Sequence, residues 1–252
     1  MSECITMCIN EHGQPIGSAL PDWTGACHPG HQGMVGRFAC LVSLDPLAHV
    51  QELFQAFGRD TSGKIWAYNF IGPFNTVSSL REWAEGASGV QEQPYFPVAD
   101  QETGKASGIA RHWRIQPDHG VIEIGGITFA PSLQRTRIAT EAIFLMMWRT
   151  MRDLGYRRLE WKCDALNAPS RAVAKRFGFR YEGTFEQAAT YEDRNRDTAW
   201  YGSLDRDWFP VERGFQSWLA PENVDDDGQQ RLKLADLIVL ERSVRAQRET
   251  AT

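Results

Sequence analysis

The pattern of apolar positions along the chain predicts several amphipathic helices. Asp45 and Pro46 suit the N-cap and the first position of a helix, because aspartate accepts the free N–H groups there and proline needs no hydrogen bond. Apolar residues follow at helical spacing, namely Leu47, Val50, Leu53, Phe54 and Phe57. Ser79 and Glu82 stand three residues apart, as in a capping box. Helices are predicted to begin at residue 45 and to cover residues 78–85, 136–154, 167–177 and 229–248.

Shorter apolar segments bounded by turn residues predict the strands. They cover residues 37–42, 95–99, 108–115, 120–129, 158–163, 179–184 and 197–204. Turn residues separate the second, third and fourth of these segments, which predicts an antiparallel meander. After the meander the pattern alternates between strand and helix. The predicted fold class is therefore α/β, with a mixed, mostly antiparallel central sheet flanked by helices.

Both ends of the chain differ in composition from its middle. Residues 1–35 are rich in Gly, Pro, His and Asn without a sustained period, so we expect an irregular arm that wraps a neighbouring subunit. An acidic run at residues 225–228 precedes the last helix, whose leucines need cover. We expect an arm (1–35), one main domain (36–219), and a linker with a C-terminal helix (220–252). Apolar surface outside the domain usually marks an interface, which predicts a homodimer.

Charge and cysteine content exclude several classes of protein. The formal net charge is −5, so no overall positive field gathers nucleic acid, and we expect no nucleic-acid partner. The longest strongly apolar stretch, residues 142–148, is too short to span a bilayer, and no signal peptide is visible. The five cysteines have no metal or disulfide spacing, and Cys27, His28 and His31 make only half a metal site. We expect a reduced cytoplasmic protein with no metal and no membrane partner.

The segment from residue 125 to residue 142 places the end of a strand, a short loop and the start of a helix in succession. Free N–H groups in the first turn of a helix, together with the helix dipole, form a site for a pyrophosphate. Arg135 and Arg137 can add charge-assisted contacts. A solvated basic helix start is the alternative. The Gly-Lys-Ser/Thr ending of a nucleotide P-loop is absent.

This segment resembles the acyl-CoA binding motif of the GNAT superfamily, Q/R-x-x-G-x-G/A. Gln134 and Ala139 fit the motif, and Arg137 replaces its first glycine, which is tolerable where only a backbone N–H is needed and φ is negative. Between about residues 37 and 210 the chain also resembles the ribosomal-protein N-acetyltransferase (RimJ/RimL-like) branch. The motifs that carry this resemblance are Glu123-Ile124-Gly125, Thr140-Glu141-Ala142, Asn167-x-x-Ser170, Arg176-Phe177-Gly178-Phe179, Tyr181-Glu182-Gly183 and Asn195-Arg196-Asp197-Thr198-Ala199-Trp200.

The resemblance implies a GNAT fold in which two parallel strands, here residues 120–129 and 158–163, splay apart around pantetheine. It implies transfer of an acetyl or other short acyl group from acetyl-CoA directly to the primary amine of a small molecule or a protein N-terminus. The thioester carbonyl would accept an N–H near Ile127, which stabilises the developing oxyanion. The implied coenzyme A contacts are Ile127, Phe129, Gln134, Arg135, Thr136, Arg137, Ile138, Ala139, Thr140, Asn167, Ser170 and Lys175.

Three residues are candidates for catalysis. Ser170 can donate a hydrogen bond, or a proton through water, to the leaving thiolate, and its alternative role is to serve the helix start. Asn167 matches a position beside pantetheine or the leaving group, and its alternative role is a turn or cap. Relatives carry an acidic residue where this sequence reads Ala188-Ala189, so Glu123 is the best candidate for the general base. Its alternative is a structural carboxylate bonded to a loop.

Two further alternatives stay open at this stage. The aromatic residues Trp66, Tyr68, Phe70 and Phe74 can line an acceptor pocket or belong to the core. Because the position of the base is altered, the sequence also allows a non-catalytic acyl-CoA-binding regulatory module.

Overall fold

The computed structural model describes residues 7–90 and 92–250, and its main element is an eight-stranded sheet. The strands lie in the order β3-β4-β5-β6-β7-β8-β10-β9. Neighbouring strands pair antiparallel except β7 and β8, which are parallel. The predicted fold class and the meander of β5, β6 and β7 are confirmed. The strand bounds are β3 Met34–Val35, β4 Ala39–Leu41, β5 Tyr95–Asp100, β6 Ala106–Gln116, β7 Val121–Phe129, β8 Arg158–Asp164, β9 Arg180–Tyr191 and β10 Arg194–Leu204.

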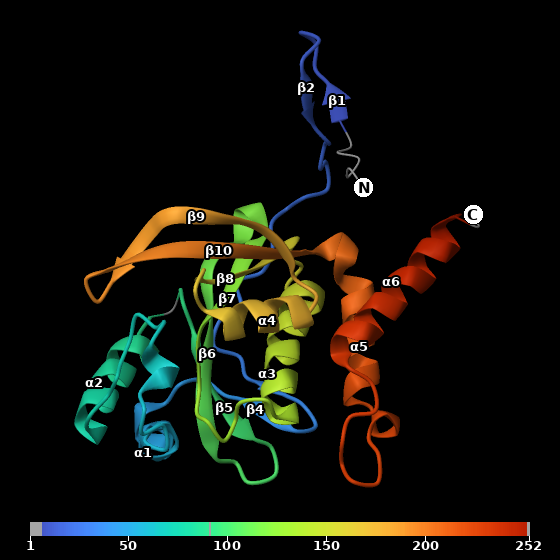
Figure 1. The fold of residues 1–252 in the computed structure, drawn as a ribbon. Coiled ribbons are helices and arrows are strands. Elements are labelled where there is room, and N and C mark those ends of the chain that lie inside the picture. The colour runs from blue at the N-terminus through green and yellow to red at the C-terminus, as the bar shows by residue number, and fades with distance from the viewer. Residues whose placement is uncertain (1–6, 91, 251–252) are drawn as a thin grey trace.

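Helices cover both faces of the sheet (Figure 1). One face carries α1 and α2, and the opposite face carries α3, α4, α5 and α6. The helix bounds are α1 Pro46–Phe57, α2 Val77–Ser88, α3 Arg137–Trp148, α4 Ala168–Arg176, α5 Trp208–Leu219 and α6 Leu234–Thr250. A π-helical turn, Arg149–Asp153, continues α3, so the helix predicted over residues 136–154 is present with a change of winding in its last part.

Local sequence determines where α1 and α2 begin. Asp45 is the N-cap of α1, and its carboxylate accepts the N–H of Leu47 at 2.8 Å, as predicted. The predicted capping box of Ser79 and Glu82 is wrong. Thr76 is the N-cap of α2, its hydroxyl accepts the N–H of Ser79 at 3.0 Å, and the Ser79 hydroxyl accepts the Thr76 N–H in return.

Three elements near the C-terminus differ from the prediction. β9 continues to Tyr191 instead of ending at residue 184. Most of its side chains are exposed, so no apolar alternation marks them, and the strand is held by its backbone ladder with β10. No helix was predicted over the residues of α5, and α6 begins at Leu234, five residues after the predicted start at residue 229.

The two layers of helices enclose two clusters of buried apolar side chains. The larger cluster lies between α3, α5, α6 and one face of the sheet, with Phe144, Phe177 and Phe215 stacked or tilted against one another. The smaller cluster lies beneath α1 and α2, where the Trp66 ring meets Phe57 edge-on at 5.1 Å. Each cluster fixes one side of the strands that carry the candidate site.

Glu141 of α3 fixes the turn between β3 and β4. Its buried carboxylate accepts the backbone N–H groups of Arg37 (3.0 Å), Phe38 (2.5 Å) and Ala39 (2.7 Å). Gly36 leaves room for this carboxylate, because a Cβ at that position would lie 2.5 Å from it. One side chain therefore ties the edge of the sheet to the helix that follows the candidate pyrophosphate loop.

Replacing Glu141 by alanine is expected to destabilise the fold strongly. Three backbone donors lose their acceptor, and one of them, the N–H of Ala39, is buried while the other two are partly buried. A buried donor without a partner costs about 1–3 kcal/mol, so we expect a loss of about 2 kcal/mol or more. Urea unfolding followed by circular dichroism measures this loss. Glu102→Ala, at an exposed turn, is the matched control and should change stability by less than about 0.5 kcal/mol. Equal midpoints for the two variants would contradict the assigned role of Glu141.

The parallel strands β7 and β8 separate after a short common stretch. Their ladder consists of Val121 with Arg158, Ile122 with Leu159, and Glu123 with Glu160. β7 continues to Phe129 and β8 to Asp164, and no further pair joins them within the described residues. A bulge near Gly126, whose φ is +56°, bends β7 at the same place. The expected splay of two parallel strands is therefore present.

The segment that follows the N-terminal hairpin and the C-terminal helix α6 both contact the rest of their own chain. Within the arm, β1 (Met7–Ile9) and β2 (Pro15–Gly17) form a hairpin that projects from the body in Figure 1. The indole of Trp23 then donates to the Asp118 carbonyl at 2.8 Å, and the N–H of Cys27 donates to the Leu154 carbonyl at 2.9 Å. In α6, Leu234, Leu237 and Ile238 are buried within this chain, whereas Leu240 of this helix and Leu232, which precedes it, are exposed. The homodimer and the domain limits stay predictions.

Among the described residues, no helix is long and apolar enough to cross a membrane.

Candidate active site

A pocket occupies the gap between β7 and β8, and residues from both faces of the sheet line it. Trp161 and Cys163 of β8 point toward the core under α3 and α4, whereas Lys162 points to the opposite face, because side chains alternate along a strand. All three line the pocket, together with Ile127 of β7. Side chains from both faces of the sheet therefore contribute to one pocket.

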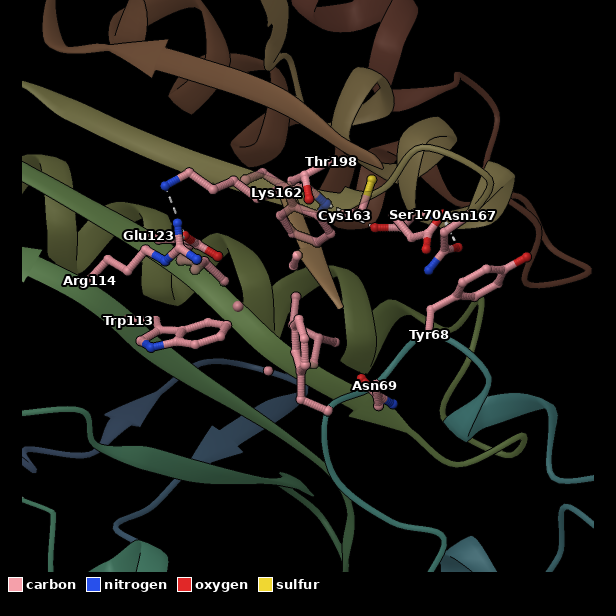
Figure 2. Close-up of a pocket in the computed structure, with 18 of the residues that line it drawn as sticks. Tyr68, Asn69, Trp113, Arg114, Glu123, Lys162, Cys163, Asn167, Ser170 and Thr198 are labelled. Atoms are coloured by element: carbon pink, nitrogen blue, oxygen red, sulfur yellow. Dashed lines mark hydrogen bonds and ion pairs between the residues drawn. The ribbon is translucent and has the colours of Figure 1, made fainter. Parts of the chain in front are cut away.

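Figure 2 shows the residues of this pocket in two groups. Ser170, Asn167 and Tyr68 lie at one end, and Glu123, Lys162 and Arg114 lie at the other. The predicted catalytic residues Ser170, Asn167 and Glu123 thus share one pocket. A molecule that spans it would meet hydroxyl and amide groups at one end and a set of charges at the other.

The Ser170 hydroxyl is oriented by a hydrogen bond that it accepts. The indole N–H of Trp161 donates to Ser170 Oγ at 3.0 Å, which leaves the hydroxyl proton of Ser170 available to a second group. Burial raises the pKa of the neighbouring Cys163 thiol, and a hydrogen bond with Ser170 opposes that shift. Ser170 can therefore donate to a sulfur atom placed in the gap.

Asn167 is the N-cap of α4. Its Oδ1 accepts the N–H of Ser170 at 3.0 Å, so the capping role belongs to Asn167 and not to the Ser170 hydroxyl. The amide nitrogen of Asn167 has no hydrogen-bond partner among the described residues, and the residue lines the pocket. Asn167 can therefore serve both as a cap and as a hydrogen-bond donor toward the gap.

Glu123 is buried at the last rung of the β7–β8 ladder. Its Oε2 lies 3.2 Å from Lys162 Nζ and 3.6 Å from Arg114 Nε. Burial raises the pKa of the Glu123 carboxyl, and the two cations oppose that shift. Gly125 leaves room for the carboxylate, since a Cβ there would lie 2.9 Å from Oε1. A carboxylate with a raised pKa at a pocket is suited to accept a proton near neutral pH.

Lys162 belongs to a chain of charges that continues behind Glu123. Its Nζ lies 2.6 Å from Glu160, and Arg158 joins Glu160 at 2.7 Å and Glu182 in a two-point contact at 2.9 and 2.5 Å. The ring of Trp200 lies 3.8 Å from the Lys162 ammonium. Lys162 was not among the site residues predicted from the sequence. The only sequence feature that points to it is the alternation of side chains along β8, which places Lys162 on the same face of the sheet as Glu123.

The N-terminus of α3 presents free N–H groups as predicted. Thr136 is the N-cap, and its hydroxyl accepts the N–H of Ala139 at 3.1 Å. Among the described residues, the N–H groups of Arg137 and Ile138 have no hydrogen-bond partner. Arg137 is not among the residues with positive φ, so the condition for replacing the motif glycine is met. Arg135 takes the left-handed conformation instead, with φ of +63°.

The side chains around the start of α3 differ in whether hydrogen bonds within the chain already hold them. Gln134 donates from Nε2 to the Phe129 carbonyl at 2.9 Å, which closes the loop after β7. Arg137 donates to the Gly228 carbonyl at 2.8 Å, so its guanidinium is held by the loop before α6. Lys175 is exposed at the end of α4. The neighbouring Arg176, which sequence reasoning missed as a site residue, donates to Thr140 Oγ1 at 3.2 Å.

The aromatic segment before α2 divides between pocket and core. Tyr68 and Phe70 line the pocket, and the Tyr68 hydroxyl donates to the Leu166 carbonyl at 3.3 Å. Trp66 and Phe74 lie in the cluster under α1 and α2, with ring centroids 5.4 Å apart. The described cysteines are free, and no group of three metal-ligating side chains occurs in the described part of the chain.

Comparison with known proteins gives a consistent result. Residues 41–180 match the model of a family described as "Acetyltransferase (GNAT) domain". A GCN5-related N-acetyltransferase from Brucella melitensis is 40% identical, with a TM-score of 0.85 over 87% of this chain and 99% of that one. A GNAT-family acetyltransferase from Chromobacterium violaceum is 36% identical, with a TM-score of 0.72 over 77% and 97%.

A more distant structure shares the fold. It is the acetyl transferase from Salmonella typhimurium that modifies the N-terminal serine of a 50S ribosomal subunit protein, with 22% identity and a TM-score of 0.57 over 69% of this chain and 99% of that one. None of the curated proteins compared matches the sequence.

Proposed function

The chain belongs to the GNAT acetyltransferase family and is an acyl-CoA-dependent acetyltransferase, and on that premise we propose that it acetylates a primary amine by direct transfer. The acceptor amine belongs to a small molecule or to a protein N-terminus. The observation that supports the proposal is the pocket between β7 and β8, which brings Ser170 and Glu123 together and is lined by side chains from both faces of the sheet. In the proposed arrangement the two substrates approach it from opposite faces.

In the proposed arrangement coenzyme A enters beside α3 and α4. The free N–H groups of Arg137 and Ile138 and the dipole of α3 bind the pyrophosphate. Pantetheine follows the edge of β7 that β8 leaves open, and an N–H near Ile127 stabilises the oxyanion. The Arg176 side chain, already in contact with Thr140, adds positive charge near the same helix turn.

The chemistry requires two proton movements. The amine nitrogen attacks the thioester carbon, its proton passes to Glu123 directly or through water, and the carbonyl oxygen becomes negative. The tetrahedral intermediate then collapses, the C–S bond breaks, and the thiolate takes a proton or a hydrogen bond from Ser170. Products are an amide and free coenzyme A. Holding the two reactants in one pocket supplies the rest of the rate enhancement.

Amine-dependent release of thiol is the experiment that tests this function. We expect the protein to release coenzyme A from acetyl-CoA in the presence of primary amines, and we expect mass spectrometry to find one acetyl group on the amine. Thiol release that is independent of every amine tested would indicate hydrolysis and overturn the proposal. Acetyl groups on a protein N-terminus alone would restrict the acceptor to proteins.

Acetyl-CoA is expected to stabilise the fold when it binds. A ligand at about 100 times its Kd adds roughly 2.7 kcal/mol to the free energy of unfolding, so the melting temperature should rise by several degrees. Differential scanning fluorimetry with millimolar acetyl-CoA measures the rise. AMP, which lacks pantetheine, is the control ligand and should give a smaller shift. No shift with acetyl-CoA would contradict the assigned coenzyme A site.

Two properties of the whole molecule complete the proposal. We propose a cytoplasmic location, which agrees with cysteines that have no disulfide spacing in the sequence. We also propose a homodimer, which would cover the exposed side chains of Leu232 and Leu240 and those of the projecting hairpin. Light scattering at micromolar concentration tests it, and a monomer mass would overturn it.

A further inference from the structure

The part of the pocket on the α1–α2 face holds positive charge that the acetyl transfer does not use. Four cationic side chains line the pocket, namely Arg111, Arg114, Lys162 and Arg196. Lys162 and Arg114 pair with Glu123. The other carboxylate in the pocket, Asp164, accepts the Leu166 N–H at 2.7 Å and the Tyr191 hydroxyl at 2.8 Å. The pocket is therefore basic in a chain whose net charge is −5.

Arg111 is held by aromatic rings instead of a carboxylate. Its guanidinium carbon lies 3.7 Å from the ring centroid of Trp113 and 4.7 Å from that of Tyr95. Nη1 donates to Gln93 at 3.1 Å, and the buried Nε has no hydrogen-bond partner among the described residues. At Gly126 a Cβ would lie 2.9 Å from that Nε. The rings fix the plane of the guanidinium without neutralising it.

Arg196 of β10 has the same character. Only 8% of the residue is exposed, its guanidinium lies 4.6 Å from the ring centroid of Phe70, and its Nε has no hydrogen-bond partner within the described chain. Neither Arg196 nor Arg111 has a carboxylate oxygen within 4 Å among the residues described. Burial lowers the pKa of both guanidinium groups. Buried donors without partners are costly, so their retention points to a ligand.

We propose that the acceptor amine carries an anionic group, and that Arg111 and Arg196 bind this group while the amine faces Glu123. This inference rests on the proposed function and names its substrate class. A carboxylate fits best, because its two oxygens match the planar fork of a guanidinium. Small amino acids and related amino-carboxylates are therefore the expected acceptors. A protein N-terminus has an amide in place of that carboxylate.

The wild-type protein tests this inference with matched pairs of amines. Each pair is an α-amino acid and its primary amide, and an aminoalkyl phosphonate separates carboxylate from phosphate recognition. We expect kcat/KM to be at least about thirtyfold higher for the amino acid than for its amide. The ionisation of the amine works against this result, because the amide has the lower amine pKa and hence more free amine at neutral pH. A preference for the acid would therefore come from recognition of the anion.

Arginine variants locate the recognition in the pocket. Arg111→Gln and Arg196→Gln should each raise KM for the amino acid at least about tenfold and leave KM for the amide nearly unchanged. Arg194→Gln is the control, since Arg194 lies on the same strand but is exposed and pairs with Glu192. Arg196→Lys, which keeps the charge, should retain part of the affinity. Melting temperatures show whether each variant is folded.

The outcomes separate this inference from the proposed function. Equal rates for acids and amides would overturn the inference and leave amine acetylation intact. A preference for acids that persists in folded Arg111→Gln and Arg196→Gln would also overturn it, because other residues would then bind the anion. Acetylation of no amine in the panel would contradict the proposed function itself. Strong turnover of the phosphonate alone would keep the anion site and replace carboxylate by phosphate.

Discussion

Replacing Glu123 by glutamine is expected to lower kcat/KM for the amine by about a hundredfold or more at neutral pH, since a positioned general base contributes roughly 10²–10⁴-fold. Glutamine keeps the shape of the side chain and removes its ability to accept a proton. The substitution also removes the carboxylate that Lys162 and Arg114 share, so the measured loss of kcat/KM includes the effect of removing their common partner. Circular dichroism and the melting temperature show whether the variant keeps its fold.

The pH dependence distinguishes a base from a structural carboxylate. Burial raises the pKa of Glu123, so in the wild-type protein the base is lost as pH falls through a value above the ordinary range of a glutamate. The loss caused by Glu123→Gln should be largest between that pKa and the pKa of the amine. It should shrink as pH rises toward the amine pKa, where free amine needs no base. An equal loss at every pH would make Glu123 structural.

Replacing Ser170 by alanine is expected to lower kcat by about 10²–10³-fold, the range found when one donor to a developing charge is removed. The affinity for acetyl-CoA should stay nearly unchanged, because the hydroxyl interacts mainly with the departing thiolate and not with the bound thioester. Stopped-flow measurement of thiol release gives kcat, and fluorimetry or calorimetry gives the affinity. Ser88→Ala, at an exposed helix end, is the control.

The Trp161 indole provides a second test of the same hydrogen bond. Trp161→Phe removes the N–H that orients the Ser170 hydroxyl while keeping an aromatic ring in the core. We expect a smaller loss of kcat than in Ser170→Ala, because the hydroxyl remains but can rotate.

Full activity in Ser170→Ala would mean that solvent protonates the thiolate, and the fold assignment would stand.

The strand–helix order could be predicted from the sequence because it depends on local patterns, whereas the splayed pair was expected only from the resemblance to the GNAT superfamily. The alternation of Leu159, Trp161 and Cys163 and the loop before residue 136 are visible in a few adjacent residues. By contrast, the contact of Glu141 with the turn before β4 joins residues more than 100 positions apart, and no local pattern indicates it. β9 was predicted too short because its mostly exposed residues show no apolar alternation, although the strand pairs with β10 along its backbone.

Only those residues of the candidate site that belong to a sequence motif could be predicted. Ser170, Asn167, Glu123 and Ile127 share the pocket, whereas the basic character of its far side depends on how β6 and β10 are placed. In the sequence, Arg111 lies in a predicted strand and Arg196 in one of the motifs that carry the resemblance, and neither was a candidate site residue. Their significance comes from burial beside aromatic rings and from the absence of a nearby carboxylate within the described residues. Such properties exist only once the sheet is assembled.

A crystal structure of the protein with coenzyme A would show whether acetyl transfer takes place in the gap between β7 and β8. We expect the pyrophosphate over the N–H groups of Arg137 and Ile138, pantetheine along the open edge of β7, and the sulfur within hydrogen-bond distance of Ser170 Oγ. Coenzyme A bound with its sulfur outside this gap, or with the gap closed by further β7–β8 pairing, would contradict this prediction.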